Sequence, residues 1–219
     1  MPIFWRRYGS EISWWIADGR TSVPLELEAN DAIFLMFRKP AVASSFRTQS
    51  PRYLPLKTID GPWQLSFPPA HGAPASATFA TLKSWSVSDD PGIRYFSGTA
   101  RYSKSVSLGD LRTGGRLLLD LGRVANVAEV FVNGRSAGIA WKAPYRVEIG
   151  GLVRKGENRI EIAVANLWRN RLIGDLQPGA NGQFAISAYN PFTKDSPLIE
   201  SGLVGPVKMI VEATAADER

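Results

Sequence analysis

The chain has 219 residues and no cysteine, and its 26 Lys or Arg residues outnumber 20 Asp or Glu residues, which gives a formal net charge of +6. Without cysteine it can form neither a disulfide framework nor a thiolate metal site. A hydrophobic content of 44% suffices for a core and excludes intrinsic disorder. The basic residues are dispersed, so we expect no nucleic-acid partner. No run approaches the roughly 18 apolar residues of a membrane span, so we expect no membrane partner.

The first 40 residues predict the closing strands of a β structure. Alternating runs at 11–16 and 21–27 flank the Asp18-Gly19 turn, and a third apolar run covers 32–38. Three strands alone are marginal in water because they cannot cover both of their faces, so these must pack on something else. Residues 41–57 lose all periodicity and are rich in Ser, Thr and Pro, which predicts a linker.

Short alternating runs begin again at residue 58. Trp63, Leu65 and Phe67 occupy one face of the first run, and we expect Trp63 in the core. Trp85 follows in a segment that ends at the Asp-Asp-Pro-Gly turn of residues 89–92. The run 99–108 places Tyr102, Val106 and Leu108 on one face, as a half-buried strand does.

The stretch from Gly115 to Asn166 predicts an antiparallel sheet that folds back on itself. Its apolar runs are separated by Asn133-Gly134, the strongest short hairpin signal, because both residues tolerate the positive φ of a type I′ turn. Residues 145–149 alternate with period two, and 159–164 do the same after a Gly-Glu-Asn turn.

The chain ends with a long Gly-, Asn-, Pro- and Ser-rich excursion over 177–201, a strand over 207–211 and a polar tail. About nine strands and no helix of note favour an all-β jelly-roll sandwich. We therefore expect four segments: terminal strands of a preceding β domain at 1–40, a linker at 41–57, the jelly roll at 58–213 and a tail at 214–219.

Four groups of residues carry a resemblance to known proteins. Gly122 to Gly134, with Gly138, Trp141, Pro144-Tyr145 and Gly156-Glu157-Asn158, resembles the galactose-binding-like jelly-roll domain of glycoside hydrolase family 2 and its relatives. Three further stretches are similar to the C-terminal region of glycoside hydrolase family 106, the α-L-rhamnosidases: Ile93 to Ala100, Asn166 to Asp175 and Ser201 to Val207. The resemblance covers about residues 58–213.

This resemblance implies an accessory part of a carbohydrate-metabolising enzyme. Catalysis in that family resides in a (β/α)8 barrel, which needs at least about 200 residues that this chain lacks. We expect the chain to have no catalytic centre of its own, and to partner a carbohydrate, such as a rhamnose-containing plant or microbial polysaccharide, or a catalytic barrel. The residues after Met1 show no export signal, whereas full-length relatives are expected to be periplasmic or extracellular. A stand-alone carbohydrate-binding module and a structural interaction domain without sugar affinity remain alternatives.

Aromatic rings stack on the apolar faces of pyranose rings while polar neighbours bind the hydroxyls. On this ground the carbohydrate-binding candidates are Trp85, Tyr95, Arg123, Asn126, Trp141, Trp168, Arg171 and Asp175. Each has a structural alternative: the tryptophans can be core, and Arg123 and Asn126 can satisfy backbone at a strand start. Arg171 and Asp175, four residues apart, can instead form a buried ion pair that pins the long loop.

Neither a metal nor a catalytic pair stands out. With one histidine and no cysteine we expect no cofactor, with a structural calcium held by Asp and carbonyl oxygens as the alternative. A glycosidase needs two carboxyl groups at a defined separation. The acids in turns and loops are Asp89, Asp90, Asp175 and Glu200, and no spacing singles out two of them.

Overall fold

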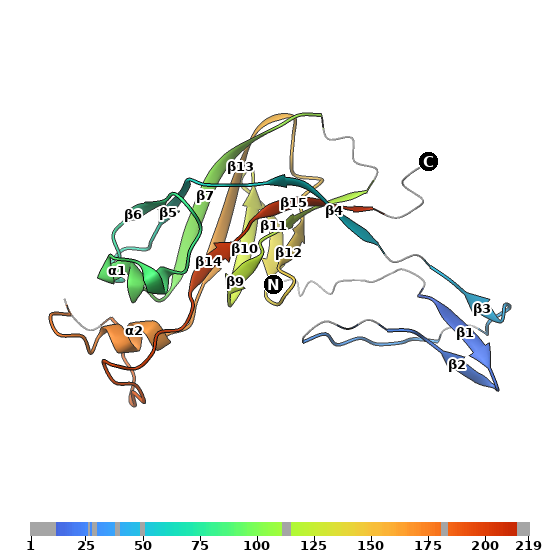
Figure 1. Ribbon diagram of the computed structural model, residues 1–219, viewed down its shortest axis with the longest axis horizontal. Coiled ribbons are helices and arrows are strands. Elements are labelled where there is room, and N and C mark those ends of the chain that lie inside the picture. The colour runs from blue at the N-terminus through green and yellow to red at the C-terminus, as the bar shows by residue number, and fades with distance from the viewer. Residues whose placement is uncertain are drawn as a thin grey trace.

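The computed structural model describes residues 12–25, 27, 30–37, 40–48, 51–110, 115–180 and 184–213. Over these residues the chain is all-β, with paired sheets that make a β-sandwich, as the sequence predicted. The body of the sandwich lies between two projections (Figure 1): an N-terminal arm on one side and the short helices on the other.

The larger sheet has six strands in the order β11-β10-β13-β7-β5-β6, and all of its pairings are antiparallel. β7 and β13 form its centre, because they pair over ten residues, from Thr99 opposite Ala165 to Leu108 opposite Gly156. The strands are β5 (Trp63–Ser66), β6 (Ser76–Phe79), β7 (Thr99–Leu108), β10 (Val127–Val132), β11 (Arg135–Ala140) and β13 (Gly156–Ala165).

The second layer contains a four-stranded sheet in the order β12-β8-β15-β4 and the two-stranded pair β14-β9. Its pairings are antiparallel as well. The strands are β4 (Arg52–Thr58), β8 (Arg116–Asp120), β9 (Arg123–Ala125), β12 (Arg146–Glu148), β14 (Gly202–Gly205) and β15 (Lys208–Ala213).

A single apolar cluster fills the space between the layers. Leu119 and Met209 from the four-stranded sheet and Ile160 from the six-stranded sheet are fully buried in it. Trp85 is fully buried beside Tyr102, with the rings stacked at 6.2 Å and 9° between planes. The Tyr102 hydroxyl accepts a hydrogen bond from the Leu203 backbone N–H at 3.0 Å, and burial raises the pKa of this phenol.

The central stretch confirms one prediction and corrects another. Asn133 and Gly134 have φ of 51° and 79° and join β10 to β11, with Val132 opposite Arg135, as expected of a type I′ hairpin. However, the strands between Gly115 and Asn166 do not form one sheet, because β8 and β12 belong to the four-stranded layer. Alternation shows that a strand has a buried face but not which layer it joins.

The N-terminal arm is a three-stranded sheet in the order β2-β1-β3, made of β1 (Trp14–Ala17), β2 (Arg20–Ser22) and β3 (Ser45–Phe46). It extends away from the sandwich (Figure 1). An ion pair between Asp31 and Lys142 ties it to the body. The expected third strand over 32–38 is wrong for residues 32–37, which form no strand, and residue 38 lies outside the described residues.

The expected linker over 41–57 contains two strands, β3 and most of β4. β4 pairs with β15 along the edge of the four-stranded sheet, yet every residue of β4 is exposed. A strand with both faces in solvent needs no alternation of apolar and polar residues, which explains why the sequence of β4 has no period of two.

Three short helices interrupt the strands: η1 (Trp85–Val87), α1 (Pro91–Arg94) and α2 (Arg169–Gly174). The expected turn at 89–92 is the start of α1, where the Asp90 carboxylate accepts the Gly92 N–H at 2.7 Å and Pro91 occupies a first-turn position. Within the described part of the chain, no helix is long and apolar enough to cross a membrane.

Trp85→Ala should lower the free energy of unfolding by about 3–5 kcal/mol, because it opens a cavity in a fully packed core. Denaturant unfolding measures this loss. Trp141→Ala is the matched control, since its side chain is 63% exposed and its loss should cost less than about 0.5 kcal/mol. Equal effects at the two positions would contradict this assignment of the core.

Candidate functional site

The candidate site is built around α2, at the end of the sandwich where β7 begins and β13 ends. Asn166, just after β13, donates its side-chain amide to the Phe96 carbonyl and accepts from the Gly98 N–H. Ser97 donates to the Leu167 carbonyl at 2.9 Å. These bonds attach the start of α2 to the segment that leads into β7, so α2 is fixed to the centre of the larger sheet.

A buried ion pair joins the middle of α2 to the residue that follows it. Arg171 Nε lies 2.8 Å from Asp175 Oδ1, and the two side chains are only 6% and 7% exposed. The other carboxylate oxygen, Oδ2, accepts the backbone N–H groups of Phe184 and Ala185 at 3.1 and 2.8 Å. The Arg171 guanidinium also lies over the Phe184 ring, 4.9 Å from its centroid. The pair therefore pins the long loop, which is the alternative kept open for these residues.

Other side chains of the α2 region hold the rest of this loop. Asn170 donates to the Ile199 carbonyl and accepts from the Ile199 N–H, at 2.8 and 2.9 Å. Arg169 donates to the Pro197 carbonyl at 2.9 Å, and Gln177 donates to the Lys194 carbonyl at 2.8 Å. The polar residues of this cluster thus hold the described part of the loop after residue 183 against α2.

The proposed sugar-binding residues fall into different environments. Trp85 is fully buried and presents no face to a ligand, which corrects its candidacy. Tyr95 is half-buried against α2, since a Cβ on Gly174 would lie 2.4 Å from the Tyr95 Cβ. Trp168 precedes α2 and is 55% exposed, so of these three rings it alone offers a large free surface.

The remaining candidates lie away from α2 or at its edge. Arg123 of β9 pairs with Glu200 at 2.9 Å on the surface, next to the end of the long loop. Asn126 joins β9 to β10 with a φ of 87°, a turn geometry that asparagine tolerates better than most residues. Trp141 is 63% exposed and precedes Lys142, which contacts the arm. The structure therefore brings Trp168, Arg171 and Asp175 together on or beside α2, whereas Trp141 follows β11, two strands away from β13 at the same end of the sheet.

The four acids considered for catalysis do not form a pair. Asp90 caps α1, Asp175 is buried against Arg171, and Glu200 binds Arg123. Asp89 is exposed beside α1. Within the described ranges, no three His, Asp or Glu side chains come close enough together to hold a metal ion.

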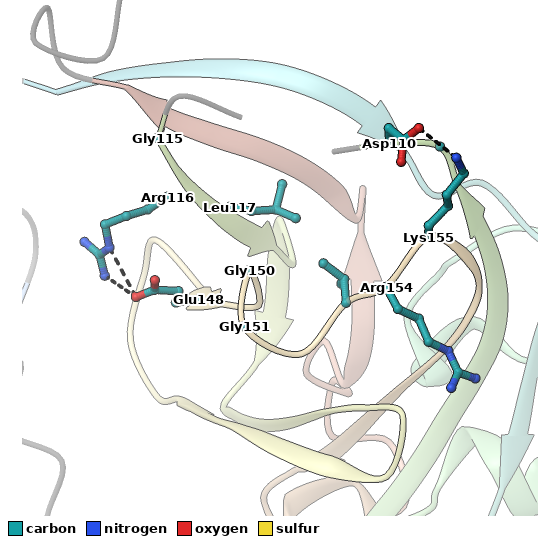
Figure 2. Close-up of a pocket in the computed structure, with 11 residues that line it drawn as sticks. Asp110, Gly115, Arg116, Leu117, Glu148, Gly150, Gly151, Arg154 and Lys155 are labelled. Atoms are coloured by element: carbon teal, nitrogen blue, oxygen red, sulfur yellow. Dashed lines mark hydrogen bonds and ion pairs between the residues drawn. The ribbon is translucent and has the colours of Figure 1, made fainter. Parts of the chain in front are cut away.

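A second feature is a hollow of about 420 Å³ at the opposite end of β7 and β13 (Figure 2). Arg116 in its wall donates to Glu148 at 2.8 Å and to Glu212 at 2.8 Å, and the bond to Glu148 raises the pKa of this guanidinium. Lys155 pairs with Asp110 at 2.7 Å. Because these charges already have partners in the chain, the hollow is a weaker candidate than the α2 region.

Sequence reasoning missed Ile186 and Tyr189 in the long loop, which are 97% and 77% exposed. It treated 177–201 as an undifferentiated surface excursion. The Arg171 and Asp175 spacing was the one local signal of order there, because it predicted the ion pair but not which loop residues it would hold.

Comparison with known proteins shows which proteins this chain resembles in sequence and structure. No family model matches the chain. The rhamnosidase of Novosphingobium sp. PP1Y has a similar structure with a TM-score of 0.85 and 46% identity, over 92% of this chain. A protein of Formosa agariphila that carries the name of a β-glucuronidase is 39% identical over 70% of this chain. The chain spans only 19% and 15% of these two relatives.

A β-D-glucuronidase of Dictyoglomus thermophilum shares the fold, with a TM-score of 0.51 and 21% identity over 76% of this chain. Together these similarities show that the chain is a β-sandwich related to part of glycoside hydrolases.

Asp175→Asn should lower the free energy of unfolding by about 3–5 kcal/mol, because it leaves the buried Arg171 charge uncompensated. The matched control is Asp110→Asn, whose pair with Lys155 is 68% and 72% exposed and should contribute only about 0–1 kcal/mol. Denaturant unfolding of both variants tests this, and similar small losses would show that the α2 ion pair does not stabilise the fold.

Proposed function

We propose that this chain is the accessory β-sandwich portion of an α-L-rhamnosidase-like glycoside hydrolase of family 106 type, with a jelly-roll sugar-binding-like domain. One observation carries the proposal: the chain matches a rhamnosidase at 46% identity and a TM-score of 0.85, while it spans 19% of that enzyme. Its role is then to support a catalytic barrel and to hold carbohydrate near it.

The acids of the chain support a non-catalytic role. A glycosidase places two carboxyl groups about 5–5.5 Å apart for retention or about 6.5–9.5 Å apart for inversion, on either side of the sugar. Instead, Asp90 caps α1, Asp175 pairs with the buried Arg171, and Glu200 pairs with Arg123 on the surface. Hydrolysis in this proposal depends on a separate barrel.

The N-terminal arm supports a role in assembly. No described residue before Ile59 is buried, and fifteen of the 24 exposed large hydrophobic side chains of the described residues precede it. Phe34, Met36 and Phe37 are 81%, 70% and 74% exposed. Such a surface is typical of a protein interface. In our proposal, residues 1–40 complete a preceding β domain and 41–57 connect it to the jelly roll at 58–213; residues 1–11 and the expected tail at 214–219 lie outside the described residues.

A stand-alone carbohydrate-binding module is the second candidate function. The observation that favours it is the exposure of two tryptophans, Trp141 and Trp168, at 63% and 55%. Exposed indole rings are suited to stack on pyranose rings.

The purified chain alone should not hydrolyse a chromogenic α-L-rhamnoside, because the loop acids that the structure describes, Asp90, Asp175 and Glu200, are each bound to a different group of the chain. The release of the chromophore is followed at high protein concentration, with an intact rhamnosidase as the positive control. Turnover by the chain alone would overturn the accessory role.

A chimera tests the structural role directly. The matching part of the Novosphingobium rhamnosidase is replaced by this chain, and the chimera should stay active. Adding Phe34→Ser, Met36→Ser and Phe37→Ser should speed thermal inactivation by about tenfold or more, since each lost apolar contact is worth about 1.5 kcal/mol or more.

The matched control for this chimera is Ile139→Ser, which removes a 54% exposed side chain from β11 of the body. It should leave the inactivation rate nearly unchanged. A chimera that is inactive, or that is indifferent to the three arm substitutions, would contradict the proposed assembly.

A further inference from the structure

The long loop contains a short segment, Phe184 to Asn190, that is anchored at both ends. At its start, the Asp175 carboxylate accepts the N–H groups of Phe184 and Ala185. At its end, Asn190 donates to the Leu172 carbonyl at 3.1 Å and accepts from the Phe192 N–H at 3.0 Å. Both anchors lie on or beside α2, so the segment is an arch held over this helix.

The arch presents its large side chains to solvent. Ile186 and Tyr189 are 97% and 77% exposed, although the residues on each side are fixed. Inside the arch, Ser187 donates to the Tyr189 carbonyl at 2.6 Å and accepts its N–H at 3.3 Å, which fixes the backbone that carries the tyrosine. An ordered loop that holds an aromatic ring outward is preorganised for a ligand, because the cost of ordering is already met on folding.

Trp168 rises from the same part of the surface. The Leu172 N–H donates to the Trp168 carbonyl at 3.0 Å, and the Leu172 carbonyl is the group that accepts from Asn190. One helical turn, about 5.4 Å, therefore separates the tryptophan backbone from the anchor beside Tyr189. Two exposed aromatic residues thus originate from neighbouring positions on one rigid support.

We propose that Trp168 and Tyr189 form a binding platform for a neutral oligosaccharide; this inference rests on the proposed function and locates its carbohydrate site. Aromatic rings pack against the apolar C–H faces of pyranoses, and the exposed indole N–H and phenol O–H donate to sugar hydroxyls. The arch holds the tyrosine at a fixed position relative to the tryptophan. Both rings then contact the same sugar chain.

The charges around the platform select against an acidic sugar. The Arg171 charge is taken up by Asp175, and Arg169 donates to the Pro197 carbonyl while it lies 5.0 Å from the centroid of the Phe192 ring. Recognition of a uronate requires a cation that is free to meet its carboxylate. Arg171 is neutralised by Asp175, and Arg169 keeps one N–H and one face of its guanidinium within the protein, so we expect the platform to prefer neutral sugars such as rhamnosides to glucuronides.

Calorimetric titration of the full 219-residue chain tests the platform. A neutral α-L-rhamnosyl oligosaccharide should bind, and a glucuronic-acid oligosaccharide of equal length should bind at least about tenfold more weakly. Trp168→Ala and Tyr189→Ala should each weaken rhamnosyl binding by about tenfold, which corresponds to one lost stacking contact. Tyr189→Phe keeps the ring and should retain most of the affinity.

Ile186→Ala is the matched control, because it removes the most exposed side chain of the same arch without removing a ring. It should leave sugar affinity unchanged. All of these side chains are at least half exposed, so the variants should fold, which circular dichroism checks.

Three results would overturn the inference: no binding of either oligosaccharide, unchanged binding by both alanine variants, or a loss with Trp141→Ala alone, which would put the sugar site at the end of β11 instead of on α2. A fourth would be faster inactivation of the Trp168→Ala or Tyr189→Ala chimera without a change in sugar affinity, which would assign the surface to a polypeptide. None of these four results bears on the accessory role, which the arm substitutions in the chimera test separately.

Discussion

The pairing of β7 with β13 over ten residues sets the position of every candidate site in the molecule. One end of this pair is joined to α2 through Asn166, and the other end opens into the hollow beside Lys155. The inward face of the pair holds Tyr102 against the fully buried Trp85. Because both strands are central in the six-stranded sheet, a group attached to their ends is held by the whole core. This rigid support is what holds the segment Phe184 to Asn190 through its bonds to Asp175 and Leu172.

The α2 region and the N-terminal arm differ in which of their side chains are exposed and which bind the rest of the chain. In the α2 region, the charged and amide side chains bind one another or the loop, and the rings of Trp168 and Tyr189 are exposed. In the N-terminal arm, apolar side chains are exposed, and Asp31 pairs with Lys142 of the body. The first arrangement suits a small ligand that stacks, whereas the second suits a protein surface that buries area. The two projections therefore support separate parts of the proposed function.

Local sequence patterns predicted a large part of the fold. The alternation at Trp63 and at Tyr102, the Asn133-Gly134 hairpin and the all-β class all follow from period-two patterns and turn chemistry, and the structure confirms them. An ion pair between Arg171 and Asp175 could also be considered from the sequence, since residues four apart on a helical turn face each other. The patterns failed at β4, which is exposed on both faces and so has no period, and at 32–37, where an apolar run is not a strand.

The sequence by itself determined most of the strand content and the tight turns, and offered the Arg171–Asp175 ion pair as one of two alternatives, because each depends on residues close along the chain. Only the tertiary structure decided that β8 and β12 join the layer opposite β10 and β13, that Trp85 is core while Trp168 is exposed, and that Asn190, next to Tyr189, binds the Leu172 carbonyl of α2. Trp85 opens η1 and Trp168 directly precedes α2, and what covers the first and leaves the second exposed comes from segments distant in sequence. Burial and proximity are properties of contacts between remote residues, and no local pattern encodes them.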